Sequence, residues 1–153
     1  MPSKATVSAI RFYSLTGKVP LTNRSKLKHF LLGLFKKENT TLASLHYIFC
    51  TDDYLLKINQ DFLGHDYFTD IITFDLAARN APVEGEVYIS IDRVRENAKT
   101  LALPFQQELH RVLFHGALHL CGYKDKKKMD IIEIRKRENS CLSAYFNVPR
   151  GTR

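Results

Sequence analysis

The chain has 153 residues, 44% of them hydrophobic and 25% charged, which is ordinary for a soluble globular protein and excludes a disordered chain. No apolar run approaches the roughly 20 residues that span a bilayer. The first residues, Met1–Ser8, lack the long apolar core of a signal peptide. We therefore expect a cytoplasmic protein, not attached to a membrane, that forms a single domain over residues 1–153.

The net charge is +7, from 23 Lys and Arg residues against 16 Asp and Glu residues. Such an excess suits a polyanionic partner such as nucleic acid, although many basic proteins bind none. Local basic clusters lie at Lys126–Lys128 and at Arg135–Arg137. Because Glu133 and Glu138 interleave with the second cluster, we interpret it as a solvated helix face.

In chain order, the apolar patterning predicts four strands, over residues 7–13, 42–50, 71–75 and 86–91. Five helices are expected to begin near Asn23, at Thr51 or Asp52, at Ser90 or Asp92, at Phe105 and near Lys127.

This element order is not a regular doubly wound pattern, and the simplest fold class is α/β (α+β), with a mixed four-stranded sheet packed against about five helices. The third and fourth strands are expected to be antiparallel or edge neighbours. Residues 59–69 are predicted to be a polar segment, and residues 147–153 a flexible tail.

The most informative stretch of the chain runs from His115 to Asp125. Residues four apart on an α-helix differ by roughly 40° in direction and by one turn in height, so His115 and His119 project side by side from one face. Two imidazoles placed in this way can share one divalent metal ion, as in other metal sites built on a His-x-x-x-His helix.

A third ligand is expected from the residues that follow the helix. Gly122 lets the chain reverse direction, which brings the next side chains back toward the histidines. Asp125 follows this turn and can supply a carboxylate oxygen. Three protein ligands leave a fourth position open for water, which is typical of a catalytic site and not of a structural one.

Other polar residues of this stretch fit a metal site less well. Cys121 lies roughly 200° around the helix from His119, and His110 lies roughly 140° from His115, so both are expected to point away. Lys124 is a cation and cannot bind a metal ion while it is charged.

The segment His115–Tyr123 resembles the YbeY family of bacterial rRNA-maturation endoribonucleases. The family motif His-Gly-x-Leu-His-Leu-x-Gly-Tyr-Asp-His is matched at every fixed position through Tyr123. Upstream, Thr69–Phe74 is similar to the family's Thr-Asp-Val-Leu-Ser-Phe block, and Gly85–Ser90 to its Gly-Asp-Ile-x-Ile-Ser strand. The likeness runs in the correct order over about residues 45–140.

The resemblance implies a zinc-dependent endoribonuclease specific for single-stranded RNA. Its role would be rRNA maturation, at the 3′ end of the small-subunit rRNA, and ribosome quality control. Its partners would be rRNA and the ribosome or ribosomal proteins, and its metal ligands His115, His119 and Asp125. Nickel, cobalt or iron could take the place of zinc.

Two positions depart from the family pattern. The third ligand of the family is usually histidine, whereas Asp125 stands here, preceded by Lys124 in place of an aspartate. An Asp oxygen binds zinc at a distance similar to that of a His nitrogen, so we expect the site to survive, with a somewhat less acidic bound water. The second departure is Leu63, which replaces an arginine thought to help in catalysis.

Another cation has to serve in place of that arginine, or the activity is weaker. Arg111 lies one turn before His115 on the same helix face. Lys124 is a second candidate, and His65, which matches a family lysine, is a third. A surface arginine and an exposed histidine are the ordinary interpretations of Arg111 and His65. Asp70 is expected to cap or brace its loop and not to bind metal.

The leading hypothesis is metal-assisted hydrolysis of RNA phosphodiester bonds. The main alternative is a metal-containing ribosome-assembly factor that is not an enzyme. A metalloprotease is disfavoured, because such enzymes use a glutamate directly after the first histidine, where Gly116 stands. An iron oxygenase also uses two histidines and one carboxylate. It is disfavoured because such enzymes usually carry these ligands on a β-barrel, whereas the two histidines here are predicted to lie on a helix.

Overall fold

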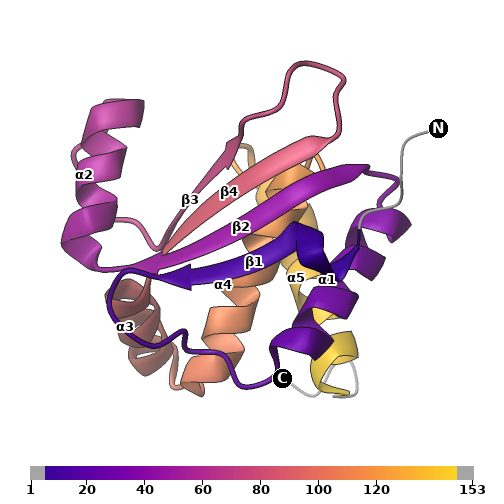
Figure 1. Ribbon diagram of the computed structural model, residues 1–153. Helices are drawn as coiled ribbons and strands as arrows, with labels where there is room; N and C mark the ends of the chain where they lie inside the picture. Colours follow the sequence, from indigo (N-terminus) through magenta and orange to yellow (C-terminus); the bar gives the residue numbers. More distant parts are fainter. Residues whose placement is uncertain (1–5, 148–153) are drawn as a thin grey trace.

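A mixed four-stranded sheet organises the computed structural model, which describes residues 6–147 (Figure 1). The strands are β1 (Ile10–Ser14), β2 (Leu42–Cys50), β3 (Ile71–Asp75) and β4 (Val83–Ser90), and they lie in the order β1-β2-β4-β3. β1, β2 and β4 are parallel, whereas the edge strand β3 is antiparallel to β4. The predicted mixed sheet and the antiparallel pairing of the third and fourth strands are therefore confirmed.

Within the described residues, five α-helices connect and follow the strands: α1 (Arg24–Lys37), α2 (Asp52–Leu63), α3 (Ile91–Leu101), α4 (Phe105–Leu120) and α5 (Lys128–Phe146). The parallel pair β1 and β2 needs a crossover connection, which α1 provides. None of these helices has both the length and the apolar character that crossing a bilayer requires.

Helices cover the two faces of the sheet unequally. α1, α4 and α5 lie on one side of it, and the larger core between them includes Leu31, Tyr47 and Leu113, all fully buried (Figure 1). A smaller core lies under α2 on the opposite face, where Leu55 and Ile58 of α2 pack with Cys50 and Ile72 of the strands. The fold class predicted from the sequence is confirmed.

Two glycines allow α4 to lie close to the sheet. A Cβ atom at Gly116 would lie 3.0 Å from both Ile71 Cδ1 and Val87 Cγ1. A Cβ atom at Gly85 would lie 2.5 Å from Cδ1 of Leu120, at the end of α4. The turns of α4 that carry His115 and His119 are thus held directly against β3 and β4.

The capping residues follow the predicted pattern. Thr51 caps α2 by accepting a hydrogen bond from the backbone N–H of Tyr54 at 3.2 Å. Ser90 caps α3 by accepting one from the backbone N–H of Arg93 at 3.1 Å. Each satisfies a backbone donor that the first turn of a helix otherwise leaves unpaired.

Three expected boundaries are wrong. The first strand begins at Ile10 and not at residue 7, because Val7–Ala9 form a 3₁₀ turn in which the Ala9 N–H bonds to the Thr6 carbonyl at 2.9 Å. The fourth strand begins earlier than expected, at Val83. α2 extends to Leu63, into the polar segment predicted over residues 59–69, and ends where Gly64 adopts φ +67°. Of the predicted tail, only Asn147 lies within the described residues.

His110 of α4 is buried within the larger core, with 5% of its surface exposed. Its Nδ1–H donates to the Gln106 carbonyl at 2.6 Å, and its ring stacks on Tyr145. Burial lowers the pKa of His110 below the ordinary value of 6.5, against the hydrogen bond to Gln106, which raises it. The folded protein therefore holds this imidazole neutral.

Acidification is expected to destabilise the fold through His110. Below about pH 6.5 the unfolded chain binds a proton that the folded chain excludes. The free energy of unfolding therefore falls as the pH drops through this window, by at most about 1.4 kcal/mol per pH unit. In the His110→Phe variant, the free energy of unfolding should change less between about pH 7.5 and pH 5.5 than it does in wild type. Urea denaturation at both pH values measures this, with the exposed His29→Phe as control. An unchanged pH dependence in His110→Phe would contradict the prediction.

Candidate metal centre

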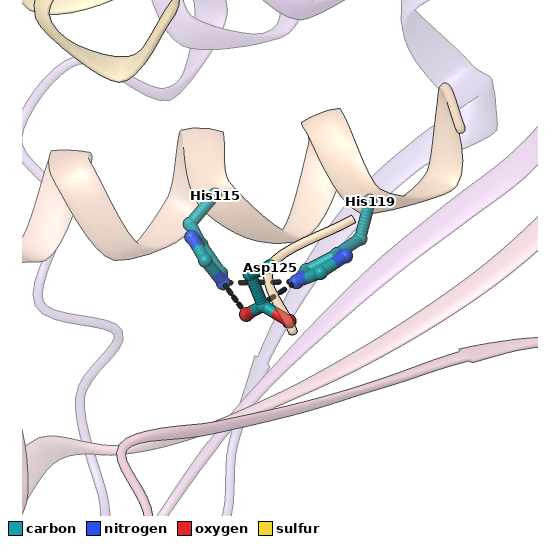
Figure 2. Close-up of side chains that lie close together, drawn as sticks. All are labelled: His115, His119 and Asp125. Carbon is teal, nitrogen blue, oxygen red and sulfur yellow. Dashed lines mark hydrogen bonds and ion pairs between the residues drawn. The ribbon is translucent and has the colours of Figure 1, made fainter. Parts of the chain in front are cut away.

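Three side chains converge at the C-terminal end of α4 (Figure 2). The Nε2 atoms of His115 and His119 lie 3.0 Å apart. Asp125 Oδ2 lies 3.1 Å from Nε2 of His119 and 3.3 Å from Nε2 of His115. The structure thus brings together the three residues that the sequence predicted as metal ligands, one ligand atom from each.

The turn after α4 carries Asp125 to the histidines. Gly122 has φ +105°, a backbone conformation that L side chains rarely adopt. The Tyr123 N–H then bonds back to the Leu118 carbonyl at 3.0 Å, which closes the turn. The Tyr123 hydroxyl donates to Glu38 Oε1 at the end of α1, at 2.9 Å, and so attaches the turn to the rest of the fold.

Each imidazole is also held on its other nitrogen. His115 Nδ1 lies 2.6 Å from Glu138 Oε2, on α5. His119 Nδ1 lies 2.8 Å from the backbone carbonyl of Tyr123. Because a carboxylate and a carbonyl accept hydrogen bonds, both partners favour the tautomer with the proton on Nδ1, which leaves the Nε2 lone pairs facing Asp125.

This donor set fits a divalent metal ion. Without a cation between them, two Nε2 lone pairs and a carboxylate oxygen would face one another at 3.0–3.3 Å. In a tetrahedral site with bonds of about 2.0–2.1 Å, ligand atoms are separated by roughly 3.3 Å. The side chain of Asp125 is 40% exposed, against 21% and 25% for the histidines, so the cluster opens to solvent on the Asp125 side.

The protonation of His115 depends on its acidic neighbours. Burial by itself lowers the pKa of His115, but the hydrogen bond and charge of Glu138, with the charges of Asp125 and Asp70, outweigh it and raise the pKa. A metal ligand has to be deprotonated at the coordinating nitrogen, so a metal ion and a second proton compete for His115.

Glu138 is the residue of the site that the sequence analysis missed. Its interpretation as part of a solvated helix face is wrong, because only 1% of its surface is exposed. Besides His115, it pairs with Arg111 and Arg135, each at 3.3 Å. The spacing of charges along α5 gave no signal of this burial, which arises from the packing of α5 against α4.

Arg111 lies one turn before His115, as predicted, but its guanidinium already forms ion pairs within the protein. Nε lies 3.2 Å from Glu108 Oε1, an ion pair too poorly aligned to be a hydrogen bond, and Nη1 lies 3.3 Å from Glu138. The side chain is 13% exposed. Arg111 therefore balances the buried charge of Glu138, while a contact with phosphate stays a prediction.

The other residues singled out in the sequence lie where their spacing suggested. His110 is buried in the larger core, and Cys121 packs against that core. Neither therefore faces the metal cluster, the group formed by His115, His119 and Asp125. Lys124 is exposed in the turn. Asp70 braces its loop: its carboxylate accepts from Asn97 Nδ2 at 3.3 Å, and its carbonyl accepts from the Ser90 N–H at 3.0 Å.

Two cavities share the metal cluster as part of their walls. One, of about 410 Å³, is lined by residues of α3, α4 and α5, among them Arg111 and Glu138. The other, of about 570 Å³, is lined by His65 and Tyr67 of the loop after α2, and by Lys126. His115 and Asp125 line both, so the two cavities adjoin at the cluster.

A model of the family described as Endoribonuclease YbeY matches residues 14–146. The chain belongs to the YbeY family. The match confirms the resemblance carried by His115–Tyr123, and it spans nearly all of the described fold.

Curated relatives agree with this assignment. The Endoribonuclease YbeY of Cytophaga hutchinsonii is 46% identical over 134 residues, which cover 88% of this chain and 94% of that one. That of Flavobacterium psychrophilum is 48% identical over 117 residues, covering 76% of this chain and 83% of that one. The solution structure of a Thermotoga maritima protein aligns with a TM-score of 0.55 and 27% identity, covering 94% of this chain and 99% of that one.

Removal of the Glu138 carboxylate should weaken metal binding. Glu138→Gln leaves His115 without an anionic partner at Nδ1, and such changes cost roughly 10- to 100-fold in metal affinity. Competition of Zn²⁺ with a chromophoric chelator at constant pH measures the affinity. Glu133→Gln changes an exposed glutamate of the same helix and serves as the matched control. Equal affinities for Glu138→Gln and wild type would show that Glu138 does not support His115 in metal binding.

Proposed function

We propose that this protein is a zinc-dependent endoribonuclease that cuts single-stranded rRNA. Its task would be maturation of rRNA, at the 3′ end of the small-subunit rRNA, and ribosome quality control. The observation that carries the proposal is the convergence of His115, His119 and Asp125 in a chain of the Endoribonuclease YbeY family. Its proposed partners are the ribosome or ribosomal proteins, and its proposed location is the cytoplasm.

The metal would be held by Nε2 of His115, Nε2 of His119 and the carboxylate of Asp125. Two imidazoles and one carboxylate suit zinc, and three protein ligands leave a position for water or substrate. When bound, such an ion polarises a phosphate oxygen and lowers the pKa of a coordinated water.

The chain's own residues prepare this chemistry. Glu138 and the Tyr123 carbonyl keep a proton on Nδ1 of each histidine and so keep Nε2 available. Lys126 and His65 line the larger cavity beside the cluster, where they can contact backbone phosphates. The net charge of +7 favours approach of a polyanion and makes RNA binding salt-dependent.

One observation favours the alternative of a metal-containing assembly factor that is not an enzyme. Leu63 stands where the resemblance expects a catalytic arginine, and Arg111 is ion-paired to Glu108 and Glu138. A metalloprotease gains no support, because Gly116 faces Ile71 and Val87 of the sheet, where a glutamate would have no room and could not reach the metal cluster.

RNA cleavage by the double variant His115→Ala, His119→Ala tests the proposal. We expect wild-type protein to cut a single-stranded RNA oligonucleotide, EDTA to abolish cleavage and added Zn²⁺ to restore it. The double variant should lose at least about 100-fold in rate, because it keeps one of three metal ligands. His29→Ala, an exposed histidine on α1, should cleave like wild type.

Undiminished cleavage by the double variant would overturn the metal-dependent mechanism. A protein that binds Zn²⁺ and ribosomal subunits but cuts no RNA, even after rigorous purification, would favour the assembly factor.

A further inference from the structure

Exposed apolar side chains gather at the end of α2 and in the loop that follows it, and two of them, Leu63 and Tyr67, line the cavity beside the metal cluster. Phe62, Leu63, Tyr67 and Phe68 are exposed over 72%, 44%, 56% and 49% of their surfaces. Large apolar groups left in water at such density usually mark a binding surface. Neither core of the fold uses these four side chains.

Tyr67 is held in a fixed orientation by a second ring. His65 stacks on it with ring centroids 5.1 Å apart and an angle of 19° between the planes. The Tyr67 hydroxyl and His65 Nδ1 lie 2.9 Å apart and share a hydrogen bond. With His65 against one face and more than half of the residue still exposed, the Tyr67 ring is available for a second flat group.

The backbone that presents this pair is anchored to the last turns of α2. The side chain of Asn59, 2% exposed, donates from Nδ2 to the Tyr67 carbonyl at 2.9 Å. The Asn59 carbonyl accepts from the His65 N–H at 3.1 Å. Gln60 Nε2 donates to Asp66 Oδ1 at 2.6 Å. These bonds fix the loop before any ligand arrives, which lowers the entropic cost of binding.

His65 and Tyr67 line the same cavity as His115, His119 and Asp125. Lys126, which also lines that cavity and follows Asp125 in the chain, adds a positive charge. A flat, exposed aromatic ring, a cation and a hydrolytic centre in one cavity match the chemistry of an unpaired nucleotide, with its base, its phosphate and its backbone.

We propose that Tyr67, braced by His65, is a stacking platform for an unpaired nucleobase next to the scissile phosphate. This inference rests on the proposed function and names the part of the substrate that the larger cavity holds. Stacking is tolerant of base identity and requires the base to be out of a duplex, so the platform would select single-stranded RNA over paired RNA without reading sequence.

Steady-state cleavage of two matched single-stranded RNA substrates, one complete and one with an abasic nucleotide, tests the platform. In Tyr67→Leu, we expect KM for a single-stranded RNA oligonucleotide to rise roughly tenfold, with kcat within about twofold, because stacking contributes about this much to affinity. An abasic nucleotide beside the scissile bond should raise KM for wild type by a similar factor and leave KM of Tyr67→Leu unchanged. Tyr67→Phe keeps the ring and its stacking on His65 but loses the hydrogen bond to His65, so its KM should stay much closer to that of wild type than the KM of Tyr67→Leu does.

The matched control is Tyr54→Leu, which removes another exposed tyrosine, at the start of α2 and outside this cavity. It should leave KM unchanged. A wild-type KM in Tyr67→Leu, or equal effects of the abasic nucleotide in both proteins, would overturn the platform.

Binding without cleavage separates this proposal from the proposed function. With EDTA present, an RNA oligonucleotide containing 2-aminopurine should lose fluorescence on binding to wild type and Tyr67→Phe, since stacking on an aromatic ring quenches this base. Tyr67→Leu should bind it roughly tenfold more weakly and without quenching. Quenching in wild type without RNA cleavage would retain the platform and reject the nuclease. RNA cleavage by wild type, together with the same fluorescence quenching in Tyr67→Leu as in wild type, would retain the nuclease and reject the platform.

Discussion

The close contact between α4 and the sheet is the constraint on which the rest of this structure depends. Gly116 and Gly85 remove the side chains that would hold the two apart, and the hydroxyl of Tyr47 donates to the Leu113 carbonyl at 2.8 Å across the buried interface. Interiors are packed too densely to absorb a displacement of this helix without cost. The rigid sheet therefore fixes the position of His115 and His119, and the turn at Gly122 needs only to bring Asp125 to them.

A buried charged residue, Glu138, supports the metal cluster from behind His115. Glu138 is a carboxylate removed from water, which is costly unless it is paired and hydrogen-bonded. Arg111, Arg135 and His115 supply the partners. The same contacts align His115 and position α5 on α4, so the arrangement that stabilises the helix pair also prepares the ligand. For this reason Arg111, although it lies on the metal-facing side of α4, is ion-paired with Glu138 inside the protein.

The cavities on the two sides of the cluster differ in character. The one between α3, α4 and α5 contains paired charges, whereas the one beside the loop after α2 offers Tyr67, His65 and Lys126. Leu63 lines the second cavity and adds an apolar surface to it. The exposed ring of Tyr67 in this cavity is the feature on which the proposed stacking of a base rests.

The sequence by itself determined the helix of the two histidines, the turn after it and the third carboxylate, because helical spacing and the left-handed conformation of Gly122 are local properties. It also determined the family and all four strands to within three residues, with the bounds of β2 and β3 matching those predicted. Only the tertiary structure decided that Glu138 is buried beside His115, that Arg111 is ion-paired and that His65 stacks on Tyr67. The contacts of Glu138 with His115 and with Arg111 join separate helices, and the stacking of His65 on Tyr67 depends on a loop conformation. Periodicity along the chain encodes neither.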